Sequence, residues 1–409
     1  MKMSLFGNRT TIKPLIISLI GVSIFNVLPI VFPNTSVFSY VLVFLFTVYF
    51  FFEIYHSNKF QRTIETNIFY KALLIWTIII ILRGLENNYN FFRGVFVSPY
   101  LLLPYLFPFF IKSFKIYDFK IILSFIHYMN VIFLSFLFLY FIQPNSNITT
   151  SLGFVEDLSK YFAFPNFFLL FSIKKAKGHE RVLSVIVFII GFLIVVYCAR
   201  RSLIWTYGWA FLLALILNIF LTKQSASNKI LYILITVFFV FILFVGIQKY
   251  KDVLFENLIV KIDADTRGAV ISDFESDMDP VSLLFGRGIS GGYLLKKTSL
   301  EINNYESKYR TIIEAGYLNL ILKGGYFYLF LIFVIYLISI YKGLFKSNNT
   351  YNKAFACFIL VHLVESYPAG ILTFNLRFFL IWYCISMCWN KKVLNATDSQ
   401  VNNELQILY

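Results

Sequence analysis

The sequence predicts an all-α polytopic membrane protein with about twelve transmembrane helices and one large extracytoplasmic loop, and three observations support this fold class. Hydrophobic residues make up 59% of the 409 residues and charged residues only 14%, whereas a soluble domain is about half apolar and about a quarter charged. Apolar runs of membrane-spanning length recur along the chain. Lysine and arginine gather in alternate connections between these runs.

The apolar runs give the order of the predicted helices. The runs near 161–173 and 376–390 are short, and Pro165 interrupts the first of them. The basic start and the apolar run after it resemble a signal peptide, but no small-residue cleavage site follows, so we expect an uncleaved first helix. The predicted spans are 15–33, 37–55, 68–82, 95–111, 121–142, 161–173, 182–199, 202–221, 230–247, 325–341, 354–372 and 376–390.

The basic residues predict the orientation. With the N-terminus in the cytoplasm, the inner segments hold 19 Lys and Arg and the short outer loops hold six, as the positive-inside rule requires. We therefore expect both termini in the cytoplasm. Five of the six outer bases are arginine, whose planar fork of donors fits phosphate oxygens; snorkelling anchors at helix ends are the alternative explanation. The six are Arg83, Arg93, Lys160, Arg200, Arg201 and Arg377.

The chain divides into four predicted parts. Residues 1–247 hold spans one to nine, 248–324 form the large outer loop, 325–390 hold spans ten to twelve, and 391–409 form a cytoplasmic polar tail. The net charge of +15 is not concentrated in a basic domain with interleaved aromatics, so we expect no nucleic-acid partner. A mixed-charge loop of this length is usually functional.

The first part of the loop predicts a short helix and a glycine-rich turn. DADTRGAVISDFESDMDP has Asp265 or Thr266 as a cap and Pro280 beyond the end of the helix. GRGISGG formally matches a dinucleotide motif, but no strand–helix–strand unit surrounds it. We expect a permissive backbone that brings Arg287 and amide groups close to a ligand, with a plain surface turn as the alternative. Its glycines are Gly286, Gly288, Gly291 and Gly292.

Among the acidic residues, Glu365 is a further candidate for a functional role. Neither the acidic residues nor the cysteines show the spacing of a metal site. Glu365 stands near the outer end of span eleven, three residues after His362, and ionisable residues in such positions are costly and often functional. A structural hydrogen bond to a neighbouring helix is the alternative. The alternating acids of 273–279 lack the glycine and terminal glutamate of an EF-hand loop, and the cysteines have no CxxC spacing.

Three motifs occur in a fixed order in and after the loop: TRGAVISDF, LLFGRGISGG and IIEAGYLNLILKGG. Together with the topology, they resemble the Wzy-type polymerases of O-antigen and capsular polysaccharide, which are related to the O-antigen ligases. The resemblance implies a GT-C-type membrane glycosyltransferase of the bacterial inner membrane, acting on the periplasmic side without a cofactor. The implied substrate is an oligosaccharide on undecaprenyl diphosphate, and the implied partners are membrane lipid and a chain-length regulator.

The same resemblance implies roles for individual arginines. The family's loop arginines correspond to Arg267 and Arg287, and the arginine after its middle helix corresponds to Arg200 or Arg201. These residues, with Arg310, are expected to bind the diphosphate, where they would stabilise the charge of the leaving group.

For the base that accepts the hydroxyl proton, Glu314 is the first candidate and Glu365 the second. We expect 307–323 to be an amphipathic helix at the membrane interface, with Gly324-Gly325 turning the chain into span ten. On such a helix, Arg310 and Glu314 would share a face, and a plain ion pair between them is the alternative to catalysis.

A ligase, a transporter and a scaffold protein are the alternative functions, and each would be expected to show different sequence features. Ligases of the same fold carry a histidine in the loop helix, and this chain has none between His179 and His362. A lipid-linked oligosaccharide flippase or other transporter should show internal repeats and charges deep in several spans, and neither is evident. A non-catalytic scaffold would leave the arginine-rich outer side unexplained.

Overall fold

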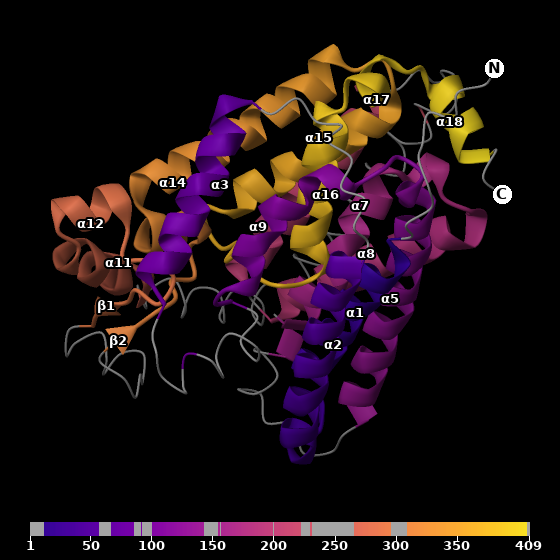
Figure 1. The fold of residues 1–409 in the computed structure, drawn as a ribbon. Coiled ribbons are helices and arrows are strands. Elements are labelled where there is room, and N and C mark those ends of the chain that lie inside the picture. Colours follow the sequence, from indigo (N-terminus) through magenta and orange to yellow (C-terminus); the bar gives the residue numbers. More distant parts are fainter. Residues whose placement is uncertain are drawn as a thin grey trace.

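The computed structural model describes residues 12–56, 67–85, 91, 100–142, 154–155, 157–198, 200–221, 230, 266–295 and 309–406. Almost all of this part of the chain is helical, with one antiparallel pair of two-residue strands (Figure 1). Among the described residues, six helices are long and apolar enough to cross a membrane. The protein is therefore an all-α multi-pass membrane protein, as predicted.

The N-terminal half begins with two long helices that pack against each other along their length (Figure 1). A 3₁₀ segment replaces part of the span predicted at 95–111, because Pro104 and Pro108 each remove a backbone donor. The elements are α1 (Lys13–Val31), α2 (Ser36–His56), α3 (Ile68–Arg83), the 3₁₀ segment Leu103–Ser113 and α5 (Asp118–Ile142).

The middle of the chain contains the predicted seventh and eighth spans and a broken sixth span. At 161–173 the structure has a π-helical turn followed by the short helix α7, whose residues are all buried. Pro165 begins α7 at a position where its missing N–H costs nothing. The elements are the π turn Ser159–Ala163, α7 (Pro165–Phe171), the 3₁₀ turn Ile173–Lys175, α8 (Gly178–Tyr197), α9 (Arg201–Ile216) and the π turn Leu217–Leu221. Apart from residue 230, the span predicted at 230–247 lies outside the described residues.

The C-terminal part supplies the centre of the bundle. All residues of α16 are buried, as expected for a helix that is apolar around its whole circumference. α15 ends at Glu365, earlier than the predicted 372, and Pro368 follows in a non-helical connection. The elements are α14 (Gly316–Tyr341), the π turn Lys342–Lys346, α15 (Thr350–Glu365), α16 (Leu376–Trp389), α17 (Lys391–Asn395) and α18 (Asp398–Gln406).

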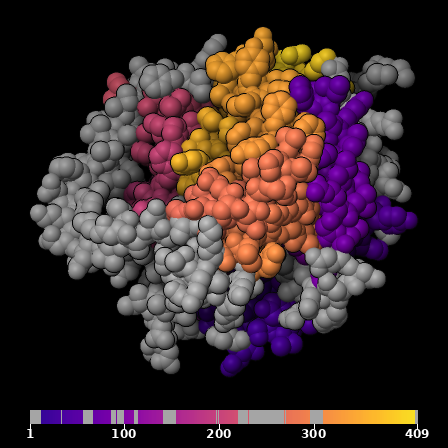
Figure 2. Space-filling view, turned by 90° about the vertical axis from the view of Figure 1, so that its left-hand side faces the viewer, coloured from indigo at the N-terminus to yellow at the C-terminus, as the bar shows by residue number. Residues whose placement is uncertain are grey.

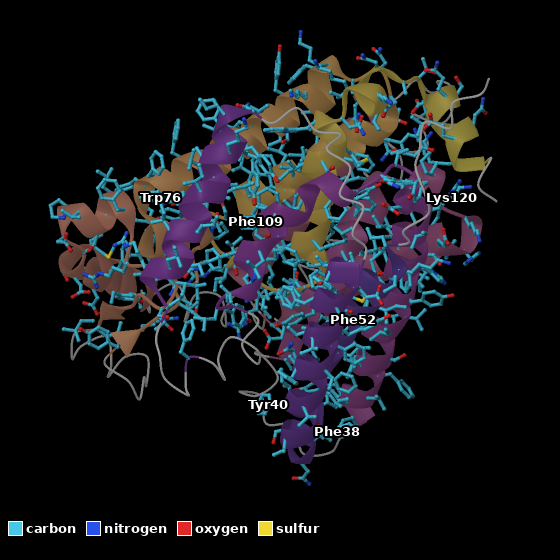
Figure 3. All side chains as sticks on the ribbon, in the orientation of Figure 1. Phe38, Tyr40, Phe52, Trp76, Phe109 and Lys120 are labelled. Carbon is cyan, nitrogen blue, oxygen red and sulfur yellow. The ribbon has the colours of Figure 1, made fainter. Side chains whose placement is uncertain are left out.

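Large apolar side chains cover much of the outer surface of the bundle. Phe38, Tyr40 and Phe52 on α2 are exposed, and Figure 3 shows Phe38 and Tyr40 near the lower end of the bundle. Exposed apolar residues also stand on α3, α5, α8 and α14. In water such a surface would associate or aggregate, so its natural surroundings are lipid tails.

The described parts of the predicted loop fold against α14 and α3 (Figures 1 and 2). They contain α11 (Thr266–Asp277), α12 (Pro280–Phe285), β1 (Tyr293–Leu294) and β2 (Tyr309–Arg310). The predicted helix after Asp265 is confirmed. Pro280 lies beyond its end and begins α12, which Asp279 caps through bonds from the N–H groups of Val281 and Ser282. A separate apolar cluster, centred on Phe274, Tyr293 and Leu322, holds these pieces together.

The helix predicted at 307–323 is only partly correct. Tyr309–Arg310 is a strand paired with β1, and α14 begins at Gly316. The pairing with Tyr293 and Leu294 keeps the backbone extended at the point where the helical pattern predicted a first turn. The helical piece from Gly316 to Gly324 is almost wholly buried, so it packs inside the protein.

Candidate functional site

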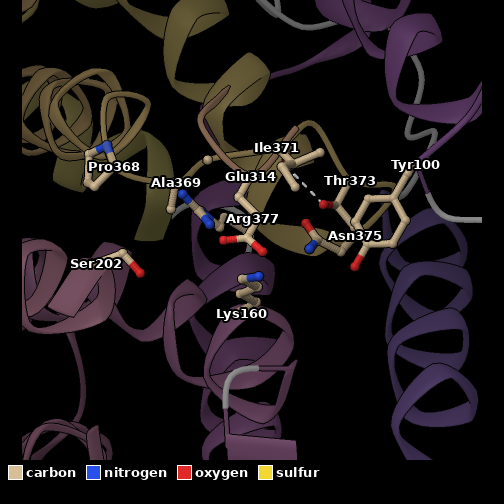
Figure 4. Close-up of a pocket in the computed structure, with 11 residues that line it drawn as sticks. Tyr100, Lys160, Ser202, Glu314, Pro368, Ala369, Ile371, Thr373, Asn375 and Arg377 are labelled. Atoms are coloured by element: carbon tan, nitrogen blue, oxygen red, sulfur yellow. Dashed lines mark hydrogen bonds between the residues drawn. The ribbon is translucent and has the colours of Figure 1, made fainter. Parts of the chain in front are cut away.

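A pocket lies beside the start of α14 and is lined by residues of the connection 366–375 between α15 and α16 (Figure 4). The N–H of Gly316 donates to the carbonyl of Ala369 at 2.7 Å, and the N–H of Tyr317 donates to that of Ser366 at 3.1 Å. A Cβ at Gly316 would lie 2.6 Å from the carbonyl oxygen of Gly370, so only glycine allows this approach. The start of α14 is thus fixed to the connection that lines the pocket.

Five separate segments line the pocket and bring two bases and one acid together. In Figure 4 the carboxylate of Glu314 points toward the space between Lys160 and Arg377. Two of the basic residues predicted to lie on the outer side, Lys160 and Arg377, thus share a pocket with Glu314, the first candidate for the proton acceptor. The lining residues are Tyr100, Lys160, Ser202, Glu314, Pro368, Ala369, Gly370, Ile371, Thr373, Asn375 and Arg377.

Arg377 is the most constrained of the charged lining residues. It is 5% exposed and lies in the first turn of α16, where the side chain of Asn375 caps the helix by accepting from the N–H of Phe378 at 3.1 Å. Its guanidinium lies 4.5 Å from the ring centre of Phe164, a distance at which a desolvated cation is attracted to the ring face.

The second candidate carboxylate lies behind Arg377. Glu365 is 1% exposed and forms an ion pair with Arg377. His362, one helical turn earlier, has its Nδ1 3.1 Å from Nη2 of Arg377. Because a guanidinium can only donate, Nδ1 must accept, and the proton of a neutral His362 lies on Nε2. The pair predicted on span eleven is therefore buried and orients an arginine.

Glu314 and Arg310 form an ion pair at 3.6 Å, but not on a helix. Arg310 belongs to β2, and Glu314 lies in the bend before α14. The Glu314 side chain is 60% exposed and that of Arg310 19%. Because screening by water makes such a pair worth about 0–1 kcal/mol, Glu314 retains the freedom to act on a ligand in the pocket.

Arg287 does not line the pocket. Its Nη1 is 2.5 Å from Oδ2 of Asp277 and donates to the carbonyl of Gly292 at 2.8 Å, while Nη2 donates to the carbonyl of Asp277. In this structure its guanidinium ties α11 to the glycine turn. A ligand would have to displace these partners before Arg287 could bind a diphosphate.

The glycine turn packs against the break in α14. Gly286 has φ +72° and Gly288 φ +81°, and the N–H groups of Arg287 and Gly288 donate to the carbonyls of Leu322 and Lys323. A Cβ on Gly286 would lie 2.4 Å from the backbone nitrogen of Gly324.

Gly325 lies on the other side of the same contact and has φ +74°. A Cβ there would lie 2.1 Å from the carbonyl oxygen of Leu284. Gly324-Gly325 therefore breaks the helix, as predicted, and it also lets two backbones touch. Lys323 completes the contact, because its Nζ donates to the carbonyl of Gly291 at 2.8 Å.

Three further arginines were predicted to bind the diphosphate, and none of them is among the lining residues of the pocket. Arg200 and Arg201 directly precede Ser202, which lines it. Arg267 belongs to α11, and its side chain lies outside what the structure describes. Sequence reasoning missed Lys160 and Arg377 as site residues, although it counted both among the outer bases. Arg377 could have been recognised as a candidate site residue, because it is a charged residue inside an apolar run.

A comparison of the chain with protein-family models, with curated proteins and with solved structures finds no match.

Proposed function

We propose that the protein is a membrane glycosyltransferase that polymerises lipid-linked oligosaccharides at the outer leaflet. The observation that carries the proposal is the gathering of Lys160, Arg377 and Glu314 around one pocket. Lys160 and Arg377 offer donors to a diphosphate, with the charge of Arg377 shared between the pocket and its partner Glu365. The exposed carboxylate of Glu314 suits the task of accepting a hydroxyl proton. The motif order in the loop supplies the substrate class, an oligosaccharide on undecaprenyl diphosphate.

In the proposed reaction, a sugar hydroxyl of one lipid-linked unit attacks the anomeric carbon of the glycan on another. The new carbon–oxygen bond forms as the bond to the diphosphate breaks, and the electron pair leaves with the diphosphate. Glu314 accepts the hydroxyl proton, a contribution of about 10²–10⁴-fold in rate. Because the leaving group is already activated, the step needs no nucleotide.

Arg377 stabilises the departing diphosphate in this proposal. Glu365 and His362 hold its guanidinium in place before the substrate arrives, so little reorganisation is needed as charge develops. Lys160 supplies a second positive charge as a point donor. Glu365 is then a positioning residue, and Glu314 remains the candidate for the proton transfer.

The test is the length distribution of surface polysaccharide in the native host, compared among the wild type, a gene deletion and Glu314→Gln. Glu275→Gln, an exposed acid on α11, is the matched control. We expect single-repeat glycan and no ladder in the deletion and in Glu314→Gln, with a normal ladder in the control. Long polymer stranded on its lipid carrier would indicate a ligase instead. An unchanged ladder in the deletion would overturn the proposal and favour a transporter.

A further inference from the structure

The loop helix α12 presents an apolar face to its surroundings. Val281, Leu284 and Phe285 are 65%, 48% and 39% exposed, and their spacing of three and four residues puts them on one side of the helix. Leu283 packs instead against the apolar cluster around Phe274 that holds the loop together. The loop therefore has a core of its own, and the exposed face is a separate surface.

This face continues the lipid-facing surface of the bundle. Tyr326, Phe327 and Phe330 on α14 are exposed, and α14 is long and apolar enough to cross a membrane. The ring of Trp76 on α3 lies 5.8 Å from that of Phe285 and 4.8 Å from that of Phe327. Figure 2 shows the loop helices beside α3 on one face of the molecule. One apolar surface thus runs from α14 across Trp76 to α12.

The contact with Trp76 indicates the depth of this surface. Trp76 lies about two helical turns, or about 10 Å, before Arg83, the last residue of α3. A charged residue at the end of an apolar helix is typical of the head-group region. The side chain of Phe285 therefore lies below the level of the head groups. In Figure 1, α12 lies level with α3 and not beyond its lower end.

The protein itself supplies hydrogen-bond partners at both ends of α12. The side chain of Asp279 accepts from the first two N–H groups of the helix at 2.9 and 3.0 Å. At the other end, the guanidinium of Arg83 donates to the carbonyls of Phe285 and Gly286, each at 2.8 Å. Backbone groups in lipid have no water to bond with, so these partners remove much of the cost of placing the helix there.

We propose that α12 lies in the membrane interface, with Val281, Leu284 and Phe285 buried among the phospholipid acyl chains of the leaflet next to the loop. Interfacial helices bury such a face about 5–10 Å into the boundary between head groups and chains, in agreement with the depth of Trp76. Through the glycine turn and the pairing of β1 with β2, this anchor reaches the segment before Glu314. The proposal does not depend on the reaction at the candidate site.

The test is electron paramagnetic resonance of nitroxide labels on the full chain in liposomes of phosphatidylcholine and phosphatidylglycerol. The four cysteines of the chain are buried, so single labels are introduced at the exposed positions Val281→Cys and Leu284→Cys. Leu337→Cys, on the exposed side of α14, is the reference for acyl chains, and Glu275→Cys, on the exposed side of α11, is the reference for water. Power saturation with oxygen and with a water-soluble nickel chelate measures how often each collides with the label.

We expect both α12 labels to collide with oxygen more often than with the chelate, as in Leu337→Cys, and the reverse in Glu275→Cys. Ratios at Val281→Cys and Leu284→Cys that match Glu275→Cys would place α12 in water and overturn the proposal. Low accessibility to both colliders would mean that a protein surface, such as a second copy of the chain, covers the face, and would overturn it too. A lipid-like ratio at only one of the two positions would count against a buried face.

Discussion

Arg377 and Glu365 form an ion pair inside the bundle, from two helices joined by the connection 366–375. Both residues are at least 95% buried, and His362 contacts the same guanidinium. Through Arg377 the two carboxylates singled out in the sequence become parts of one arrangement, with Glu314 in the pocket and Glu365 behind its wall.

Removing one partner of this pair should destabilise the protein more than removing both. Arg377→Leu leaves a buried carboxylate without its cation and should lower the free energy of unfolding by about 3–5 kcal/mol. The double variant Arg377→Leu with Glu365→Leu removes the uncompensated charge and should recover part of that loss. Thermal unfolding of the purified protein in detergent measures the difference, and equal losses in the two variants would contradict the expectation.

Glu314→Gln should slow the reaction without changing stability. The variant keeps the shape of the side chain but cannot accept a proton, so we expect the single-turnover rate to fall about 10²–10⁴-fold. The exposed pair with Arg310 contributes about 0–1 kcal/mol, so the thermal midpoint should stay close to that of the wild type. A normal rate with purified lipid-linked oligosaccharide would remove Glu314 from the catalytic role.

The glycine turn should be intolerant of a side chain. Gly286→Ala places a Cβ against the backbone at Gly324 and forces an unfavourable φ, at a cost of about 1–3 kcal/mol. Gly208→Ala in α9, where a Cβ would meet nothing within 4 Å, should be neutral or stabilising by up to about 1 kcal/mol. Limited proteolysis of the 266–295 region reports the difference, and similar protection of both variants would refute the close-packing role.

The stabilisation of the N-terminus of α12 by the Asp279 cap should depend on pH. Hydrogen bonds from Ser282 and the nearby backbone lower the pKa of Asp279 below its usual 3.8. Since the folded pKa is the lower one, the stabilisation is complete above the unfolded value and is lost as pH falls through the folded value. Hydrogen exchange at Val281 and Ser282 should therefore be faster in Asp279→Ala at neutral pH, and the difference should shrink below about pH 3.8. A constant difference down to strong acid would argue against the carboxylate as the cap.

The loop and the tail should lie on opposite sides of the membrane. Glu275 on α11 and Ser399 on α18 are both exposed, and the cysteines of the described part of the chain are buried and leave little background labelling. In intact cells, a membrane-impermeant maleimide should label Glu275→Cys and leave Ser399→Cys unlabelled until the cells are opened. The reverse pattern would invert the predicted orientation.

Composition and apolar run length were sufficient to predict an all-α membrane protein, since hydrocarbon admits few other arrangements of the backbone. The same local signals predicted the helix after Asp265 and the break at Gly324-Gly325. They failed where contacts distant in sequence decided the outcome. Pairing with β1 holds 309–310 extended, and Pro165 with its buried surroundings divides the sixth span.

For the candidate site, the sequence by itself singled out basic residues predicted to lie on the outer side, together with Glu314 and Glu365. Only the tertiary structure decided how they combine. It brings Lys160 and Arg377 beside Glu314 in one pocket. It also pairs Arg377 with Glu365 and Arg287 with Asp277. These pairings depend on the packing of helices far apart in the chain. Hydrophobic periodicity reports which residues are buried, but it does not report which buried charge will meet which partner.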